Sequence, residues 1–343
     1  MVFCFHVLKP LSLVFAKIFG FSEKDGETRF RYLVGCCLDN TSISDYCKDH
    51  MAVSADTILK LGKLPLKEMT RKCNRLLSVS SGMALKSALY KGSDLSIDYH
   101  DIVYSGVRTL FTIKTIVAGK IRRCHRFGVL CVTGNKRFCA LGVEPYKSGT
   151  PNREIVRKLL TQAPTGFDTV LMDMFFCGTG VYDEIERNDR NFITPYKIND
   201  TIDELYRESL LDGETVKPYH VRKDAGKSHW KSIYLHLIPD PDDEYHPYAS
   251  NLKDIKIKEH YPHRWNEENL FKSKNCVKPV TSTTHDSFRL LLFTITLILA
   301  SLWKLLVRSR QHITIKRFRK KLLETINEYT FTLSKVDETT AIT

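Results

Sequence analysis

Three polar residues in the run 261–272 have the spacing to act together on a phosphate group. Read as a helix, Tyr261, Arg264 and Glu268 fall within about 60° of one another around the axis. A carboxylate on such a face can hold a metal ion while the guanidinium and the phenol grip a nearby phosphate. A solvated helix face is the alternative interpretation. Because Pro262 fits only a first turn, we expect the helix to begin at Tyr261 or Pro262.

Two further carboxylates lie in or next to predicted strands, and these strands would have to support the helical face. Apolar residues alternate around Asp98, which places its side chain on the strand face opposite Ile97. Asp173 ends a compact apolar run of the buried-strand type, at the end where open α/β sheets place ligands. A carboxylate there is costly unless it meets a cation or a donor. For either acid alone, a strand-end cap or turn residue is the better interpretation.

The elements around these acids predict an α/β domain. Runs rich in Ile, Val, Leu, Phe and Tyr, punctuated by glycines, read as successive strands, and helical spacing lies between the later ones. The predicted strands are 94–104, 110–118, 125–133, 137–143, 167–172 and 192–197, and the predicted helices are 152–160 and 178–187. Strands followed by alternating helices and strands are typical of α/β folds.

The amino-terminal part of the chain is helical and basic. The apolar stretch 1–21 is cut by Lys9-Pro10 and reads as a packed, partly helical segment and not as a signal peptide. Ser42 or Ser44 could cap a helix through His50, and Ser54 a second through Leu61. This pair favours a helix-turn-helix and an ordinary helical bundle about equally. Its candidate phosphate contacts are Lys60, Lys63, Lys67, Arg71, Lys72 and Arg75.

Composition narrows the partners and the compartment. The formal net charge of +13 over 343 residues favours a polyanionic partner such as nucleic acid or an anionic membrane surface. The hydrophobic fraction of 43% is that of a globular protein and argues against a disordered one. The ten cysteines include no C-x-x-C pair, so we expect reduced thiols in a cytosolic protein.

Three segments, in this order, resemble the DDE transposases of bacterial and archaeal insertion sequences. They are Ile97-Asp98-Tyr99-His100-Asp101-Ile102-Val103-Tyr104-Ser105-Gly106, Leu171-Met172-Asp173-Met174-Phe175-Phe176 and Tyr261-Pro262-His263-Arg264-Trp265-Asn266-Glu267-Glu268. The similarity spans roughly 94–307 and is closest to the cut-and-paste group with a Y-x2-R-x3-E-x6-K signature. Any one of these segments would be weak evidence for the family, but the three in this order are strong evidence for it.

The resemblance implies a ribonuclease-H-like fold and assigns roles to particular residues. Asp98, Asp173 and Glu268 would be the metal-binding and catalytic triad, and Tyr261 and Arg264 would contact the phosphate at the transposon end. The signature lysine falls at Asn275, and Lys272 is the expected substitute. The residue after the second acid is Met174, where the group usually has a basic one. Asp101 rivals Asp98, because a bulge in the strand would exchange the two.

The implied chemistry is metal-dependent cleavage and transfer of DNA strands. Three converging carboxylates need divalent cations between them, and oxygen ligands point to Mg²⁺ or Mn²⁺, with two ions expected. Two such ions can activate a water or a 3′-hydroxyl for in-line attack on phosphorus. The expected partners are double-stranded DNA, as terminal inverted repeats and as target, and a second copy of the chain across paired ends. We expect a cytoplasmic, nucleoid-associated protein that does not bind membranes.

The expected organisation is a helical region at 1–90, a catalytic domain at 91–307 and a basic tail at 308–343. A β-rich insertion at about 198–258 would contain a helix at 203–211 and strands at 214–222 and 228–239. The apolar run 288–307 resembles a membrane span, but Arg289 and Lys304 leave an uncharged stretch too short for a ~30 Å hydrocarbon core. A core helix packed on the sheet fits better. The alternatives are a ribonuclease-H-like nuclease without strand transfer, a non-catalytic DNA-binding descendant and, least favoured, a single-pass membrane protein.

Overall fold

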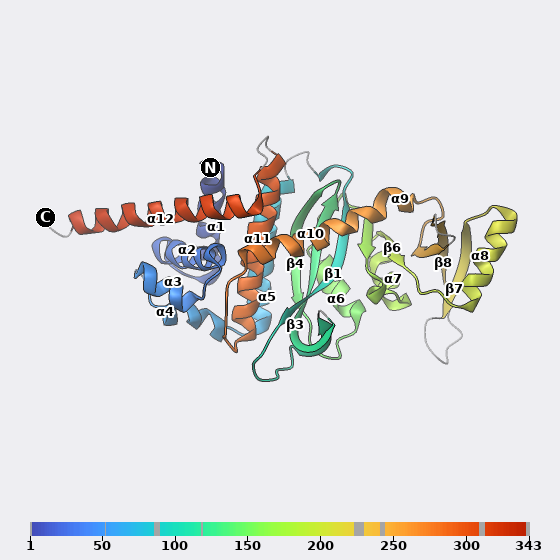
Figure 1. Cartoon of the computed structure of the whole chain (residues 1–343), viewed down its shortest axis with the longest axis horizontal. Coiled ribbons are helices and arrows are strands. Elements are labelled where there is room, and N and C mark those ends of the chain that lie inside the picture. Colours follow the sequence, from blue (N-terminus) through green and yellow to red (C-terminus); the bar gives the residue numbers. More distant parts are fainter. Residues whose placement is uncertain are drawn as a thin grey trace. The chain divides into compact units, whose positions relative to one another are not determined.

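The chain divides into two compact units (Figure 1). The computed structural model describes residues 2–51, 53–85, 90–117, 119–222, 230–240, 244–308 and 313–340, with side chains described at 8–307 and 313–327 within these ranges. The helical unit comprises Met1–Leu89, Ser105–Thr109 and Asn269–Thr343, and the sheet unit comprises Tyr90–Tyr104 and Leu110–Glu268. Residue 118 of the expected strand 110–118 and residues 228–229 of the expected strand 228–239 lie outside the described residues.

The helical unit is built from capped, amphipathic helices. Ser42 and Ser54 cap their helices as expected, each accepting a hydrogen bond from a backbone N–H three residues on. The second helix of this pair is a short α-helix continued by a 3-10 turn, and its action as a DNA-reading helix stays a prediction. In chain order the elements are α1 (Val2–Phe19), α2 (Glu23–Asp39), α3 (Ile43–His50), α4 (Ala55–Leu59), η1 (Lys60–Lys63), α5 (Leu66–Leu85), η5 (Asn275–Val277), α11 (Asp286–Arg308) and α12 (Ile315–Thr340).

Helix α11 is the expected apolar helix, and it forms part of the core of the helical unit. Its main contacts are with α5, η1 and α2, so the expectation that it packs on the sheet is wrong. Among the described helices it is the one long and apolar enough to cross a membrane, and 78% of its most apolar stretch is buried within the protein. The Arg289 guanidinium donates to the carbonyl oxygens of Thr283 and Thr281 at 2.8 and 3.3 Å. A buried helix with its charge satisfied in this way is typical of a protein core.

The sheet unit is a mixed sheet flanked by helices. Strand β1 (Asp94–Val103) pairs antiparallel with the long β3 (Lys120–Gly134) and parallel with β5 (Thr169–Met172), as Figure 1 shows for β1 and β3. Strand β5 is buried at every residue, which is typical of a central parallel strand. The remaining elements of this part are β2 (Thr112–Val117), β4 (Arg137–Pro145), α6 (Asn152–Leu160), η3 (Met174–Phe176), α7 (Thr179–Glu186) and β6 (Asn191–Pro195).

The expected β-rich insertion continues the same sheet. Helix α8 (Asp200–Asp212) leads into β7 (Val216–Arg222), β8 (Trp230–Pro239) and β9 (Tyr245–Ser250). Because β9 pairs antiparallel with β6, the strand order is β2-β3-β1-β5-β6-β9-β8-β7, with β4 also paired to β3. The sequence did not predict β9.

A helical run carries the polar face identified in the sequence. It consists of α9 (Ile257–His260), the 3-10 helix η4 (Tyr261–Arg264) and α10 (Trp265–Lys274). The run therefore begins at Ile257, and the expected start at Tyr261 or Pro262 is wrong. Pro262 is accommodated because it lies in the first turn of the 3-10 segment, where a missing N–H costs little.

Candidate active site

Asp98 and Asp173 lie side by side at the sheet. The last pair of the parallel ladder between β1 and β5 joins Ile97 to Met172, so the next residues are the two aspartates, on strands about 4.8 Å apart. Each carboxylate is oriented by the next backbone N–H: Tyr99 donates to Asp98 Oδ1 and Met174 to Asp173 Oδ1, both at 2.7 Å. Two acids held next to each other need a cation nearby.

Arg264 supplies a cation at this point. Its Nη1 lies 3.4 Å from Oδ2 of Asp98, and its Nη2 lies 2.8 Å from Oε1 of Glu268. The guanidinium carbon is 5.7 Å from the centre of the Tyr261 ring, and the Tyr261 hydroxyl donates to the carbonyl oxygen of Met172 at 3.4 Å. The helical run thus places Tyr261, Arg264 and Glu268 together, as the sequence predicted.

The electrostatics of Asp98 reflect this crowding. Burial raises the pKa of Asp98 to about 6. Arg264 and the Tyr99 N–H act to lower the pKa, whereas the charges of Asp173 and Glu268 act to raise it. Burial and the neighbouring acids disfavour the charged form of Asp98, so a bound cation would stabilise its carboxylate.

A second acid, Glu267, is buried beside the site and was missed in the sequence. Its side chain is fully buried, and neither carboxylate oxygen has a hydrogen-bond partner of ordinary geometry among the described residues. Burial, and after it the charge of Asp98, raises the pKa of Glu267 well above its usual range. We therefore expect a neutral Glu267. Glu268, turned about 100° away on the helix, contacts Arg264.

A set of hydrogen bonds that the sequence did not reveal, here called the Asp94 tie, joins the helical run to Asp94 of β1. The buried Asp94 carboxylate lies 2.9 Å from Nδ1 of His260 and 2.8 Å from Nδ1 of His263. Asn266 donates from Nδ2 to the carbonyl oxygen of Gly134 at 2.6 Å. The two histidines, one turn apart beside Tyr261, were the signal available in the sequence, but their common partner lies far away along the chain.

Asp101, the rival for the first acid, is engaged elsewhere. Arg126 binds it through two hydrogen bonds, Nε to Oδ1 at 2.8 Å and Nη2 to Oδ2 at 2.7 Å. The pairing of β1 with β3 runs from Asp94 to Val103 without a bulge, so the exchange of the two acids does not occur. The geometry therefore favours Asp98.

The lysine predicted to contact a phosphate is Lys272. Lys272 follows Glu268 by one turn in α10 and belongs to the helical unit, so its approach to the acids stays a prediction. At the signature position, Asn275 accepts a hydrogen bond from Lys274 at 3.3 Å. Lys274 is only 1% exposed, and burial lowers its pKa to about 7. A lysine in that environment is unsuited to hold a DNA phosphate.

The donor atoms of the site are carboxylate oxygens, which suit a hard cation. Among the described residues, no group of three or more His, Cys, Asp or Glu side chains is placed to hold a metal ion. Arg264 explains this at Asp98 and Glu268, because its guanidinium bridges the two carboxylates. Carboxylate oxygens alone fit Mg²⁺ or Mn²⁺ better than zinc.

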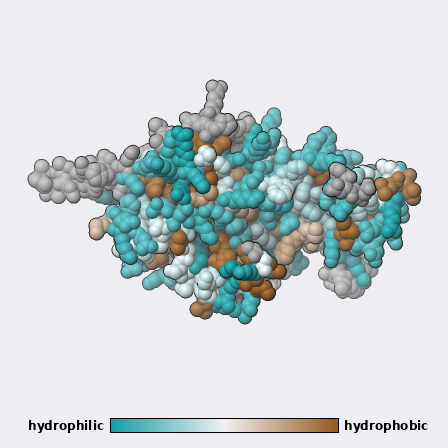
Figure 2. All heavy atoms as spheres, viewed as in Figure 1, coloured by the Kyte–Doolittle hydropathy of each residue, from teal (hydrophilic) through white to brown (hydrophobic). Residues whose placement is uncertain are grey.

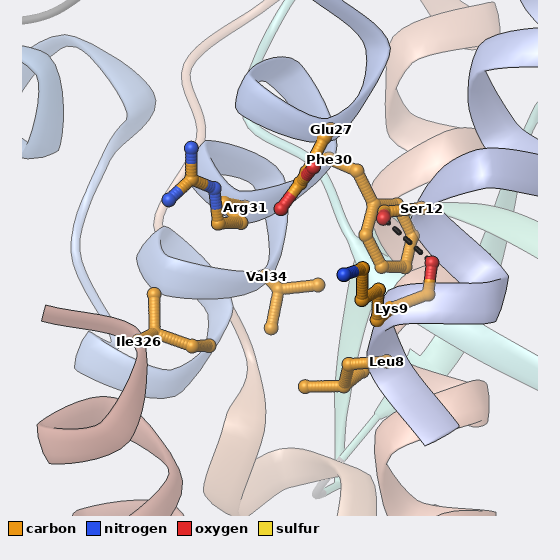
Figure 3. Close-up of a pocket in the computed structure, with 8 residues that line it drawn as sticks. All are labelled: Leu8, Lys9, Ser12, Glu27, Phe30, Arg31, Val34 and Ile326. Carbon is orange, nitrogen blue, oxygen red and sulfur yellow. Dashed lines mark hydrogen bonds between the residues drawn. The ribbon is translucent and has the colours of Figure 1, made fainter. Parts of the chain in front are cut away.

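Two surface hollows of the protein differ in size and in position. The first, between α1 and α2 of the helical unit, has a volume of about 30 Å³, which is room for little more than one water molecule (Figure 3). The second, of about 420 Å³, lies in the sheet unit beside Asp173. Its lining residues are Met174, Pro195, Tyr196, Lys197, Ile198, His246, Pro247 and Tyr248. Only the second has the size and the chemistry to receive part of a polymer.

Comparisons with known proteins give one family match and a likeness to a solved structure. A family model described as "Transposase DDE domain" matches residues 118–303, just over half of the chain. Among solved structures, the chain is similar to a piggyBac transposase synaptic complex with hairpin DNA, with a TM-score of 0.55 and 12% identity over 96% of this chain and 78% of that chain. At this identity the likeness shows the fold, and it confirms the expected ribonuclease-H-like class. No curated protein matches the chain.

Proposed function

Because the chain belongs to the family of the transposase DDE domain, we propose that Asp98, Asp173 and Glu268 form the metal-binding site with which it cuts and joins DNA. DDE transposases cleave and transfer DNA strands, and the chain is an enzyme of this class. The observation that supports the assignment is the position of Asp98 on β1 beside Asp173, which follows β5, with Arg264 between Asp98 and Glu268. Cut-and-paste transposition is the reaction that fits best.

The family uses divalent metal ions, and this donor set favours two Mg²⁺ or Mn²⁺ ions. When bound, such ions activate a water or a 3′-hydroxyl and stabilise the leaving oxygen at phosphorus. The chain's own part is to hold the acids in register. The Tyr99 and Met174 N–H groups orient Asp98 and Asp173, and the Asp94 tie holds the helical run that carries Glu268.

Arg264 and Tyr261 are the proposed phosphate contacts. In this structure the Arg264 guanidinium forms ion pairs with Asp98 and Glu268. Its planar fork is suited to bind a phosphate in two places, so we expect it to turn to DNA once these carboxylates are neutralised by other cations. Tyr261 lies against the guanidinium and would limit its movement.

The proposed partner is double-stranded DNA, both as the terminal inverted repeats of a mobile element and as target. The hollow beside Asp173 contributes Tyr196 for stacking and Lys197 for a phosphate. Lys272, the helical region 1–90 and the basic tail 308–343 are proposed to add further DNA contacts. A homodimer across paired ends and association with the nucleoid complete the proposal.

The test is a strand-joining assay on supercoiled plasmid with the full chain, Mg²⁺ or Mn²⁺, and DNA ends from the element that encodes it. We expect nicking and joining by the wild type, and loss of both in Asp98→Asn, Asp173→Asn and Glu268→Gln while DNA binding persists. Asp101→Asn is the matched control from the same strand and should retain the chemistry. Nicking without joining would favour a nuclease, and end binding without either reaction a non-catalytic descendant.

A further inference from the structure

The strands β2 and β3 form a two-stranded ribbon that extends beyond the rest of the sheet. The pairing of β1 with β3 stops at Val103 and Cys124. Toward the hairpin end, β3 continues to pair with β2 through four further cross-strand pairs that end at Val117 and Lys120, and at the first of them Arg123 also accepts a hydrogen bond from the Tyr104 N–H at 2.8 Å. At about 3.4 Å per residue the three pairs beyond Arg123 make a projection of about 10 Å.

The side chains of this ribbon combine an apolar tip with positive charge. Ile116 and Ile121 lie directly opposite each other, and they are 72% and 75% exposed. Lys114, Lys120 and Arg122 are also exposed, and the sequence 112–125 contains no Asp or Glu. These two facing isoleucines form a small apolar patch within a cationic hairpin, which a partner with both apolar and anionic surface could cover.

Duplex DNA is the partner whose chemistry matches. The three cations suit phosphates, whereas lysines are depleted in protein interfaces. Proteins that enter the minor groove often insert an apolar side chain between base steps and kink the duplex. Phosphate contacts and an inserted apolar side chain discriminate little between base sequences. The segment 112–125 also has no Asn or Gln that could bind base edges. These features favour a target of variable sequence over a defined terminal repeat.

We propose that the β2–β3 ribbon docks on the target DNA, with Ile116 and Ile121 wedged into the minor groove. Lys114 lies on the same face of the ribbon and would contact a flanking phosphate, whereas Lys120 and Arg122 lie on the opposite face and would reach the phosphates with their long side chains around the edge of the ribbon. The choice of target as occupant rests on the proposed function. Binding and bending of duplex DNA by the ribbon are separable from the chemistry, because the acids of the site lie outside the segment 112–125.

The test measures binding and bending together, with the full chain in EDTA so that no cleavage occurs. The probes are duplexes of several unrelated sequences that carry a fluorescent donor and acceptor at their two ends. The double variant Ile116→Ala/Ile121→Ala should lose the bend, seen as energy transfer equal to that of free duplex. The triple variant Lys114→Gln/Lys120→Gln/Arg122→Gln should bind about 10- to 100-fold more weakly, with a slope of log K against log [salt] smaller by about 2–3.

Matched controls come from the same unit. Leu211 is 90% exposed on α8, and the Arg187 side chain is 71% exposed after α7, so Leu211→Ala and Arg187→Gln should leave binding and bending unchanged. Thermal melting of each variant verifies folding. The proposal is overturned if the isoleucine variant still bends DNA, if the charge variant loses affinity for one sequence only, or if either variant changes only self-association. A chain that bends DNA but never cuts it would retain this inference and lose the proposed function.

Discussion

Arg264 binds Glu268 across one helical turn, with Nη2 2.8 Å from Oε1. The same guanidinium reaches Asp98 at 3.4 Å, so a single cation serves two acids of the candidate triad. A metal ion bound by these two carboxylates would compete with Arg264 for them. We therefore expect the Arg264 side chain to turn away from Asp98 and Glu268 when a metal ion is bound.

Arg264→Gln should lower the stability of the metal-free chain and increase its response to metal. The two carboxylates are partly buried, so losing their cation should cost about 1–3 kcal/mol. Mn²⁺ should then raise the melting temperature more than in the wild type, because no side chain competes for the acids. Thermal melting with and without Mn²⁺ measures this. Arg126→Gln, which breaks the Asp101 pair, is the control, and an equal Mn²⁺ shift in all three proteins would contradict the prediction.

The raised pKa of Asp98 predicts a loss of stability as pH rises in the absence of metal. The group titrates at about 6 in the native chain and near 3.8 when unperturbed, so the native state holds the proton more tightly. Its contribution is fully present below pH 4 and is lost as pH rises to about 6, by about 3 kcal/mol at most. Denaturant unfolding of wild type and Asp98→Asn from pH 4 to 7 should show the wild type falling relative to the variant. Parallel curves would refute the assignment.

The neighbouring acids Glu267 and Glu268 should respond in opposite ways to the same substitution. Glu267 is expected to be neutral, so Glu267→Gln replaces one uncharged polar group by another and should retain cleavage within about 10-fold. Glu268→Gln removes a proposed metal ligand and should reduce cleavage by more than about 100-fold. A DNA-nicking assay with both purified variants decides this. If Glu267→Gln were as inactive as Glu268→Gln, the roles assigned to the two residues would have to change.

The tie between Asp94 and the two histidines should influence rate more than binding. In His263→Ala the run that carries Arg264 and Glu268 loses one of its anchors to β1, and a small displacement of reacting groups lowers rate steeply. We expect a fall in the cleavage rate of about 10- to 100-fold, with DNA affinity little changed. Single-turnover cleavage and a binding titration separate the two. His220→Ala, which removes an exposed hydrogen-bond partner of Ser232, is the control and should leave the cleavage rate unchanged.

Most strands and helices could be predicted because their apolar periods are regular, and helix 152–160 agrees with α6 at both ends. Strand β9 could not, because Pro247 interrupts a short run with few apolar residues, and proline argues against a strand paired on both sides. The start of the helical run could not be predicted from Pro262, because this proline lies in a 3-10 turn that continues a helix begun at Ile257.

The site was predictable where local geometry decides it and hidden where long-range contacts do. The helical face of Tyr261, Arg264 and Glu268 and the place of Asp173 after a buried strand follow from local patterns, whereas the assignment of Asp98, Asp173 and Glu268 to one metal site comes from the resemblance to a family and stays a prediction. The shared partner of His260 and His263 required the fold, because Asp94 is at the start of a distant strand. The burial of Glu267 also required it, since periodicity alone does not say which of two adjacent helical residues faces the core.

The pairing of β9 with β6 has a consequence for how this chain can be shortened. Without the residues between β6 and the helical run, β6 would become an open margin whose free amide and carbonyl groups could recruit other chains. A trimmed version would therefore be prone to precipitate even with every acid intact. Any reduced form for crystallisation or genome engineering should keep β9 as a shield over that margin.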